Sequence, residues 1–226
     1  MKLKALPLKQ FNITNLPEKY YMIHPDTQMT KINDVIGYGV IATKLIPKGT
    51  IVWILDDLTQ RLDESFVHNL DEVRKKELLK YCYRYRSGEF AFVWDLGRFL
   101  NHNSNPNCIT TAYDFEIAVR DIYPGEEITI DYGTLNLDEP FECLRNDEEA
   151  GVRHTILPDD PLNLYSEWDK KAAEAMSYFN QVEQPLKHLI NDKYKDKVIA
   201  VAAGIETIDS SINIYYKKGS VNSDNT

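Results

Sequence analysis

The longest hydrophobic pattern of the chain lies in its C-terminal part. Between Leu164 and Leu189, apolar residues recur at steps of three and four, which is typical of a helix with one buried face. The sequence at 158–161, Pro-Asp-Asp-Pro, predicts that this helix starts with Asp160 as N-cap and Pro161 as first residue. Pro185 is expected to end or kink it. We expect the stripe to pack within the chain, the alternative being a face for a partner protein.

Residues 30–133 show shorter patterns separated by turn sequences. Two β-rich runs, residues 40–43 and 50–55, flank the turn sequence LIPKG and predict a hairpin-like pair of strands. Residues 109–120 predict a second hairpin around a tight turn, and residues 127–133 predict a further strand. The region is therefore expected to be mainly β.

Two other segments interrupt this β pattern. Residues 63–82 have approximate helical spacing of apolar positions and predict one helix. Residues 98–108, RFLNHNSNPNC, are rich in turn formers and predict a polar loop. The chain as a whole is thus expected to combine β and α elements.

Aromatic residues occupy alternate positions in two short runs between residues 81 and 94. They are Tyr81, Tyr83, Tyr85, Phe90, Phe92 and Trp94. Alternation suits short strands with one aromatic face. Periodicity alone favours ordinary core packing for this face, and the alternative is the wall of a channel.

Charge and cysteine content narrow the classes of function. The chain has 26 Lys and Arg against 35 Asp and Glu, a net charge of −9, which argues against a general nucleic-acid binder. An acidic surface either improves solubility or favours a basic partner such as a Lys-rich peptide. Three cysteines without a Cys-x-x-Cys pair argue against a zinc cluster and against a disulfide framework.

No apolar run approaches the roughly 18 residues that a membrane span needs, and the N-terminus lacks the apolar region of a secretory signal. We therefore expect a soluble intracellular protein, cytoplasmic or nuclear. A secreted effector with an unusual signal stays an alternative.

Three short motifs follow one another along the chain. They are Gly37-Tyr38-Gly39, the segment from Arg98 to Asn107 that contains Asn101-His102, and Glu-Ile-Thr-Ile-Asp-Tyr-Gly at 127–133. Each alone is also typical of an ordinary turn or edge strand. Together, in this order, they resemble the SET-domain family of S-adenosylmethionine-dependent protein lysine methyltransferases, over about residues 19–136.

This resemblance implies a fold, a reaction and a set of site residues. The fold would consist of short β-sheets around a knot-like core, with α elements and a C-terminal helical region. The reaction would transfer a methyl group from S-adenosylmethionine to a lysine of a basic protein or peptide, a histone or another. Tyr132 would be the catalytic tyrosine. The implied cofactor-binding residues are Gly37, Tyr38, Gly39, Arg98, Asn101, His102, Tyr132 and Phe141, and the implied channel residues are Tyr85, Phe92 and Trp94.

The residue types suit this chemistry. Glycines at 37 and 39 would let the backbone approach the cofactor, and the amide and imidazole of Asn101 and His102 suit an adenine edge. An apolar channel would favour the neutral amine over the ammonium, whose ordinary pKa is about 10.4.

The chain also departs from the family pattern. Asn103-Ser104 stands where many members have Ser-Cys, and Cys143 is the one cysteine in the segment that follows the domain. We therefore expect no metal site, with Cys143 as a core thiol. These departures keep open an alternative, a catalytically silent SET-like module that binds a partner with or without cofactor.

The expected organisation has four parts, and no oligomeric state follows from it. They are an N-terminal flank at 1–18, a SET domain at 19–136 with a helical insert at about 60–85, a post-SET-like segment without zinc ligands at 137–157, and a helical appendage at 158–226.

Overall fold

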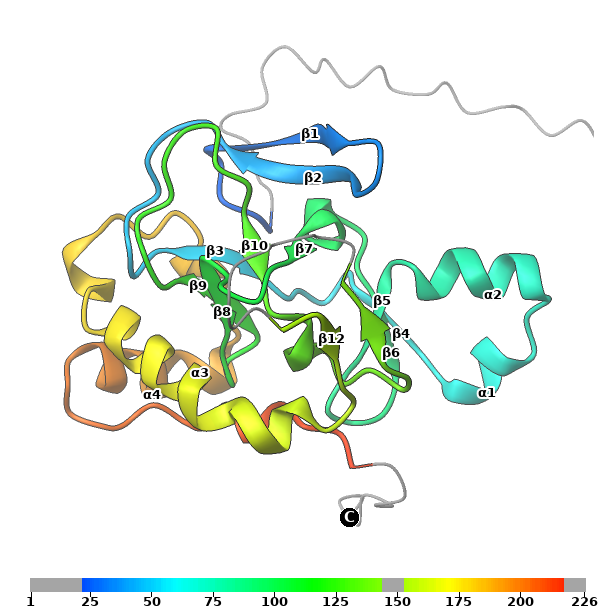
Figure 1. Ribbon diagram of the computed structural model, residues 1–226. Helices are drawn as coiled ribbons and strands as arrows, with labels where there is room; N and C mark the ends of the chain where they lie inside the picture. The colour runs from blue at the N-terminus through cyan, green and yellow to red at the C-terminus, as the bar shows by residue number, and fades with distance from the viewer. Residues whose placement is uncertain (1–21, 144–152, 218–226) are drawn as a thin grey trace, which may run out of the picture.

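The fold is built from several small sheets and two groups of helices (Figure 1). It is given by a computed structural model, which describes residues 22–143 and 153–217. The strands are β1 (Thr27–Asn33), β2 (Gly37–Ala42), β3 (Ile51–Ile54), β4 (Gln60–Leu62), β5 (Cys82–Arg84), β6 (Phe90–Phe92), β7 (Asn101–His102), β8 (Cys108–Thr110), β9 (Phe115–Ala118), β10 (Thr129–Ile130), β11 (Phe141–Glu142) and β12 (Thr155–Ile156). The α-helices are α1 (Glu64–His68), α2 (Glu72–Leu79), α3 (Asp160–Met176) and α4 (Asp192–Ala202).

The strands pair into five sheets within the described residues. Two sheets have three strands, in the orders β3-β9-β8 and β4-β6-β5, and both are antiparallel. The pairs β1-β2 and β11-β12 are antiparallel, whereas β7 and β10 run parallel. This mixture of short antiparallel strands and helices confirms the expected β and α fold class.

The prediction that residues 40–43 and 50–55 pair as a hairpin is wrong. β2 pairs with β1, and β3 pairs with β9. All four residues of β3 are buried, so this strand is covered on both faces, which a local hairpin alone would not provide. The segment between them is instead tied to a distant turn, with Ile46 bridged to Ile122.

The second expected hairpin is confirmed. β8 and β9 pair antiparallel, with Cys108 opposite Ala118 and Thr110 opposite Glu116. Asp114 in the turn has φ of +62°, a left-handed conformation that Asp adopts more readily than most residues. The alternating aromatic segment also forms the expected short strands, β5 and β6.

The single helix expected over 63–82 is two helices, α1 and α2. The break comes at Asp71, whose side chain accepts a hydrogen bond from the backbone N–H of Arg74 at 3.0 Å and so caps the second helix. Such an N-cap starts a new helix rather than continuing an old one. The two helices extend away from the body of the molecule (Figure 1).

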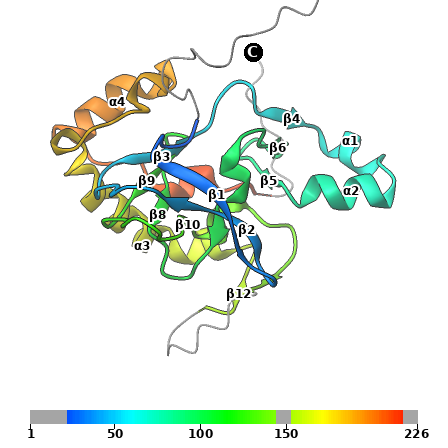
Figure 2. The ribbon, with the colours of Figure 1, turned by 90° about the horizontal axis from the view of Figure 1, so that it is seen from above.

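The C-terminal helix α3 begins at Asp160 and ends at Met176, well before Pro185. The N-cap residue is Asp159 and the first helical residue is Asp160, so the predicted start, with Asp160 as N-cap, is wrong by one position. The next segment is a 3₁₀ turn at Phe179–Gln181, and the apolar stretch after residue 192 forms α4. The stripe of α3 does pack within the chain, where Ala175 and Met176 join a core with residues of β3 and β9. Figure 2 shows α3 and α4 gathered beside these strands.

Some expectations fall outside the described residues. The flank at 1–18 does so entirely, and the post-SET-like segment does so over residues 144–152. None of the helices that the structure does describe is long and apolar enough to cross a membrane.

Candidate active site

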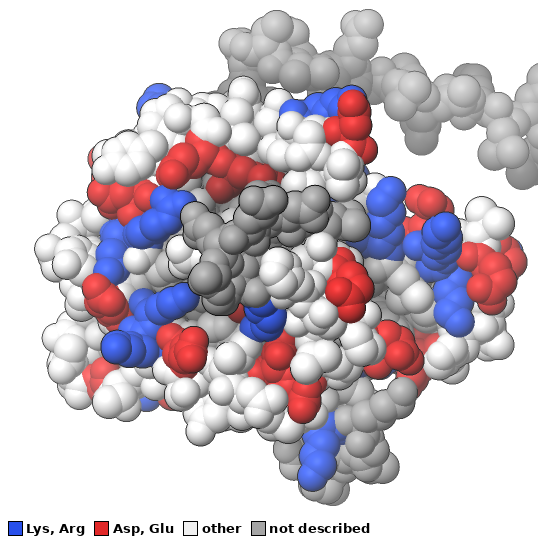
Figure 3. Space-filling view, viewed as in Figure 1, with Lys and Arg blue, Asp and Glu red and all other residues white. Residues whose placement is uncertain are grey.

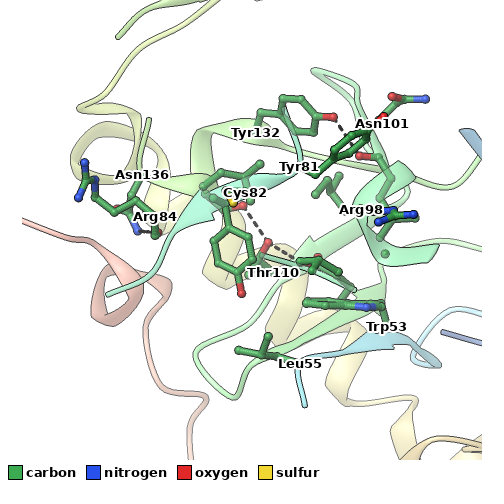
Figure 4. A pocket seen from close by; sticks show the side chains of 18 of the residues that line it. Trp53, Leu55, Tyr81, Cys82, Arg84, Arg98, Asn101, Thr110, Tyr132 and Asn136 are labelled. Carbon is green, nitrogen blue, oxygen red and sulfur yellow. Dashed lines mark hydrogen bonds between the residues drawn. The ribbon is translucent and has the colours of Figure 1, made fainter. Parts of the chain in front are cut away.

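A cavity of about 480 Å³ lies between β2, β5, β7, β8, β9 and the turn after β10 (Figure 4). Seven of the residues expected at the site line it, namely Gly37, Tyr38, Arg98, Asn101, Tyr132, Phe141 and Tyr85. They come from five separate segments of the chain, so only the fold brings them together.

The parallel pairing of β7 with β10 joins two of the three motifs. Thr129 lies opposite Asn101 and Ile130 opposite His102, which places Tyr132 just beyond the pair. The Tyr132 hydroxyl donates a hydrogen bond to the Leu100 carbonyl at 3.0 Å, and its backbone N–H donates to His102 Nδ1 at 3.1 Å. The two motifs are therefore locked to each other. The segment 98–108 was expected as a loop. Its first two residues belong to a 3₁₀ helix, Leu96–Phe99, and it also contains the short strand β7.

Asn101 joins the first motif to the other two. Its Nδ2 donates to the Tyr38 carbonyl at 3.0 Å and to Glu127 Oε1 at 2.8 Å. A Cβ at Gly39 would lie 2.6 Å from Glu127 Oε1 and 2.8 Å from Asn101 Nδ2. A Cβ at position 39 would therefore crowd side chains of the chain itself, which is a physical reason for glycine that differs from the expected approach of a ligand.

Gly37 has a different environment. Its φ of +84° lies in the left-handed region, and a Cβ there would meet no atom of the described structure within 4 Å. This open space borders the cavity. Gly37 is therefore the glycine where a bound molecule has room to approach the backbone.

His102 does not line the cavity, although Asn101 beside it does. Its imidazole is buried, stands 5.5 Å from the Tyr132 ring centroid, and has Nε2 3.4 Å from Ser104 Oγ. In the structure its side chain supports the Tyr132 turn.

Of the three expected channel residues, Tyr85 alone lines the cavity. Its hydroxyl donates to Asp114 Oδ2 at 2.9 Å. Phe92 lines a separate pocket beside α1 and α2. Trp94 is 40% exposed and its Nε1 donates to Asp56 Oδ1 at 3.0 Å. In the register of this sheet Phe92 lies opposite Cys82, and Tyr83 lies opposite Ala91. Phe92 and Tyr83 therefore point to opposite faces of the sheet, and Trp94 lies beyond the end of β6.

Several cavity residues carry no motif and were missed by sequence reasoning. They include Trp53, Leu55, Cys82, Thr110 and Glu116. Burial raises the pKa of Glu116 to about 7, although a hydrogen bond from Thr110 acts against this. A lone carboxylate within the apolar run FEIAV was the sequence signal that could have found it.

A second cluster of polar groups lies behind Tyr132. The buried carboxylate of Asp131 accepts hydrogen bonds from the backbone N–H of Gly133 at 2.9 Å and from Trp168 Nε1 at 3.1 Å, and it pairs with Arg153. Trp168 belongs to α3. The C-terminal helix therefore holds the turn that carries Tyr132.

The three cysteines are free thiols, and Cys143 is half-buried with Sγ 3.5 Å from the Arg153 carbonyl. Over residues 22–143 and 153–217, no group of three or more His, Cys, Asp or Glu side chains is arranged to hold a metal ion.

Comparison with known proteins agrees with the fold and the motifs. Residues 37–133 match the family model of the SET domain. The variant-silencing SET domain-containing protein of Plasmodium falciparum (isolate 3D7) is 25% identical over 159 residues, covering 59% of this chain and 6% of that protein. The histone-lysine N-methyltransferase trr of Drosophila melanogaster is 29% identical over 111 residues, covering 42% of this chain and 4% of that protein. Residues 37–133, less than half of the chain, therefore match the SET domain, and the chain spans only a small part of the length of these two relatives.

Proposed function

We propose that this chain transfers a methyl group from S-adenosylmethionine to a lysine side chain of a protein, with Tyr132 as the catalytic residue. The observation that carries the proposal is the convergence of the three motifs on one cavity. The β7–β10 pairing and the Asn101 hydrogen bonds tie them together, and Gly37, Asn101 and Tyr132 all line that cavity.

The residues present fit the proposed cofactor. The open space at Gly37 admits a ligand against the backbone, and Asn101 presents an amide beside it. Arg98 supplies a cationic group at the wall of the same cavity, suited to a carboxylate. When bound, the cofactor supplies an electrophilic methyl group on a sulfonium.

The chain itself would supply position and environment. Methyl transfer to an amine needs the two reacting atoms aligned at near-attack distance, so it depends mainly on orientation. The Leu100 carbonyl fixes the Tyr132 hydroxyl, which in this proposal orients the amine. Aromatic and apolar walls disfavour the charged ammonium, which has no lone pair to react.

The proposed substrate is a basic protein or peptide. Support comes from the net charge of −9 and from the similarity to one relative that is named a histone-lysine N-methyltransferase. Figure 3 shows acidic and basic side chains interspersed on the face in view, so this face does not mark where a basic substrate would lie.

The test is incubation of the full chain with isotope-labelled S-adenosylmethionine and either histones or a cell extract. We expect label on protein lysines, identified by mass spectrometry. Calorimetry with the same cofactor separates the alternative of a silent binding module, which the Asn103-Ser104 departure favours. Binding without transfer to any protein would support that alternative.

A further inference from the structure

The inner part of the cavity holds a carboxyl group that the proposed function leaves without a role. Glu116 lies on β9 between Phe115 and Ile117, whose side chains join the core with α3. Since successive side chains on a strand point to opposite faces, Glu116 points away from that core. It is 3% exposed and lines the same cavity as Tyr132.

The two oxygens of this carboxyl group differ in their partners. Oε1 accepts a hydrogen bond from Thr110 Oγ1 at 2.8 Å. Oε2 is buried and has no hydrogen-bond partner among the described residues. A buried acceptor without a donor is costly, so Oε2 is the place where a donor brought by a ligand would be bound.

Among the described residues, Glu116 accepts one hydrogen bond, from Thr110, and forms no ion pair with a basic side chain. Trp53 of β3 lies opposite it in the sheet, and the titratable groups that sense it are the Tyr83 phenol of β5 and the Cys108 thiol of β8. The arginines nearby act on these neighbours, Arg61 on Tyr83 and Arg120 on Cys108. Basic side chains also line the cavity, but Arg84 is paired with Asp138 and Arg86 with Asp114, which leaves Glu116 Oε2 as an acceptor for a cation that enters.

A chain of hydroxyl groups lets Glu116 exist in either protonation state. Thr110 Oγ1 lies 2.8 Å from Thr134 Oγ1, which lies 2.8 Å from the Asp131 carbonyl. When Glu116 is ionised, Thr110 donates to it. When Glu116 is protonated at Oε2, Thr110 still donates to Oε1 and Thr134 still donates to the Asp131 carbonyl. Both arrangements satisfy every hydroxyl proton.

We propose that Glu116 binds the ammonium group of the target lysine through Oε2 and takes up one of its protons. This inference rests on the proposed function. One N–H bond of the ammonium breaks and one O–H bond forms at Oε2, while the electron pair stays on nitrogen and Oε1 keeps its hydrogen bond from Thr110. The products are a neutral amine, ready to act as a nucleophile, and a neutral carboxyl group. The hydroxyl chain connects this carboxyl group to the residue before Tyr132.

A titration of the full chain tests this without methyl transfer. The carbon-13 signal of the Glu116 carboxyl group, assigned by its loss in Glu116→Gln, is followed with pH in the absence and presence of n-butylammonium, which mimics a lysine side chain. We expect the midpoint to fall by about one pH unit with the probe, because a nearby cation favours the carboxylate. An unchanged midpoint at saturating probe would overturn the proposal.

The second readout is the dependence of kcat/KM on pH. Wild type should lose activity as the pH falls through the Glu116 midpoint, and Glu116→Gln should lack this limb and be slower by roughly 10²-fold. Glu167→Gln, an exposed glutamate on α3, is the matched control and should behave as wild type. An identical pH limb in Glu116→Gln would contradict the proton transfer. If no methyl transfer occurs at all while the probe shifts the midpoint, the proposed function fails and the cation site stands.

Discussion

Glu116 is a buried acidic residue in the wall of the cavity, and its ionisation lowers the free energy of unfolding. The other three residues of β9 are apolar, and burial raises the pKa of this carboxyl group from 4.5 to about 7. The folded chain therefore holds the proton more tightly than the unfolded chain. The resulting contribution to stability is fully present below the unfolded pKa and is lost as the pH rises through about 7.

Glu116→Gln removes this titration and keeps the shape of the side chain. Between pH 4.5 and pH 8, the free energy of unfolding of the variant should rise relative to wild type by about 3 kcal/mol, since each pKa unit corresponds to about 1.4 kcal/mol. Urea unfolding at both pH values measures the difference. A constant difference would show that the carboxyl group is not buried as described.

The two glycines of the first motif should respond differently to alanine. At position 39 the new Cβ would collide with Glu127 and Asn101, and overpacking of this kind costs about 1–3 kcal/mol. At position 37 it would meet open space, leaving a left-handed backbone strain of about 1–2 kcal/mol.

Unfolding free energies of Gly39→Ala and Gly37→Ala therefore form a matched pair. The Asn101–Glu127 hydrogen bond should be lost only in the first, and an NMR shift of the Asn101 side-chain amide detects this. The same amide shift in both variants would contradict the separate roles.

At the scale of elements, α3 reaches the site through one side chain. Trp168 donates to the buried Asp131, next to Tyr132. Trp168→Phe keeps most of the packing but leaves the carboxylate short of one donor, which should lower the free energy of unfolding by about 1–3 kcal/mol and lower kcat. Tyr165→Phe, on the exposed side of α3, is the control. Unchanged stability and turnover in Trp168→Phe would show that α3 does not support the Tyr132 turn.

The elements divide into those that local pattern could predict and those that it could not. The β8–β9 hairpin and the stripe of α3 follow from turn residues and from spacing along a continuous segment. The pairing of β3 with β9 depends on contacts between residues more than 60 positions apart in the chain, and no local pattern specifies a distant strand partner. The break at Asp71 was missed because the apolar spacing continues through it. The Asp71 side chain accepts a hydrogen bond from the Arg74 N–H and so starts a new helix at this point.

At the scale of the molecule, the C-terminal helices share a core with the strands. Residues of β3, β9, α3 and α4 belong to one buried cluster. A chain that ends at residue 157 would expose the strand side of this cluster, so we expect it to lack cooperative unfolding in circular dichroism. A cooperative transition for the shortened chain would contradict a common core and favour a separate appendage.

The site was predictable as far as motifs carried it. Tyr132, Asn101 and Gly37, which the resemblance implied as site residues, line one cavity, and their catalytic and cofactor-binding roles stay predictions. Glu116 and Trp168 could not be assigned to the site from the sequence. Glu116 belongs to it because its face of β9 meets the cavity, and Trp168 because its face of α3 meets the Asp131 carboxylate. Phe92 and Trp94 were misplaced for the same reason, since the orientation of β6 relative to β5 is a tertiary property.

The most direct test of the proposed activity compares wild type with Tyr132→Phe in transfer of labelled methyl groups to protein lysines. The change removes one hydroxyl group, which donates to the Leu100 carbonyl, and leaves the aromatic ring. We predict that wild type labels lysine and that the variant binds S-adenosylmethionine with similar affinity but transfers at least roughly 10²-fold more slowly. Equal rates for the two proteins would contradict the role of Tyr132, and absence of transfer by wild type would contradict the proposed function itself.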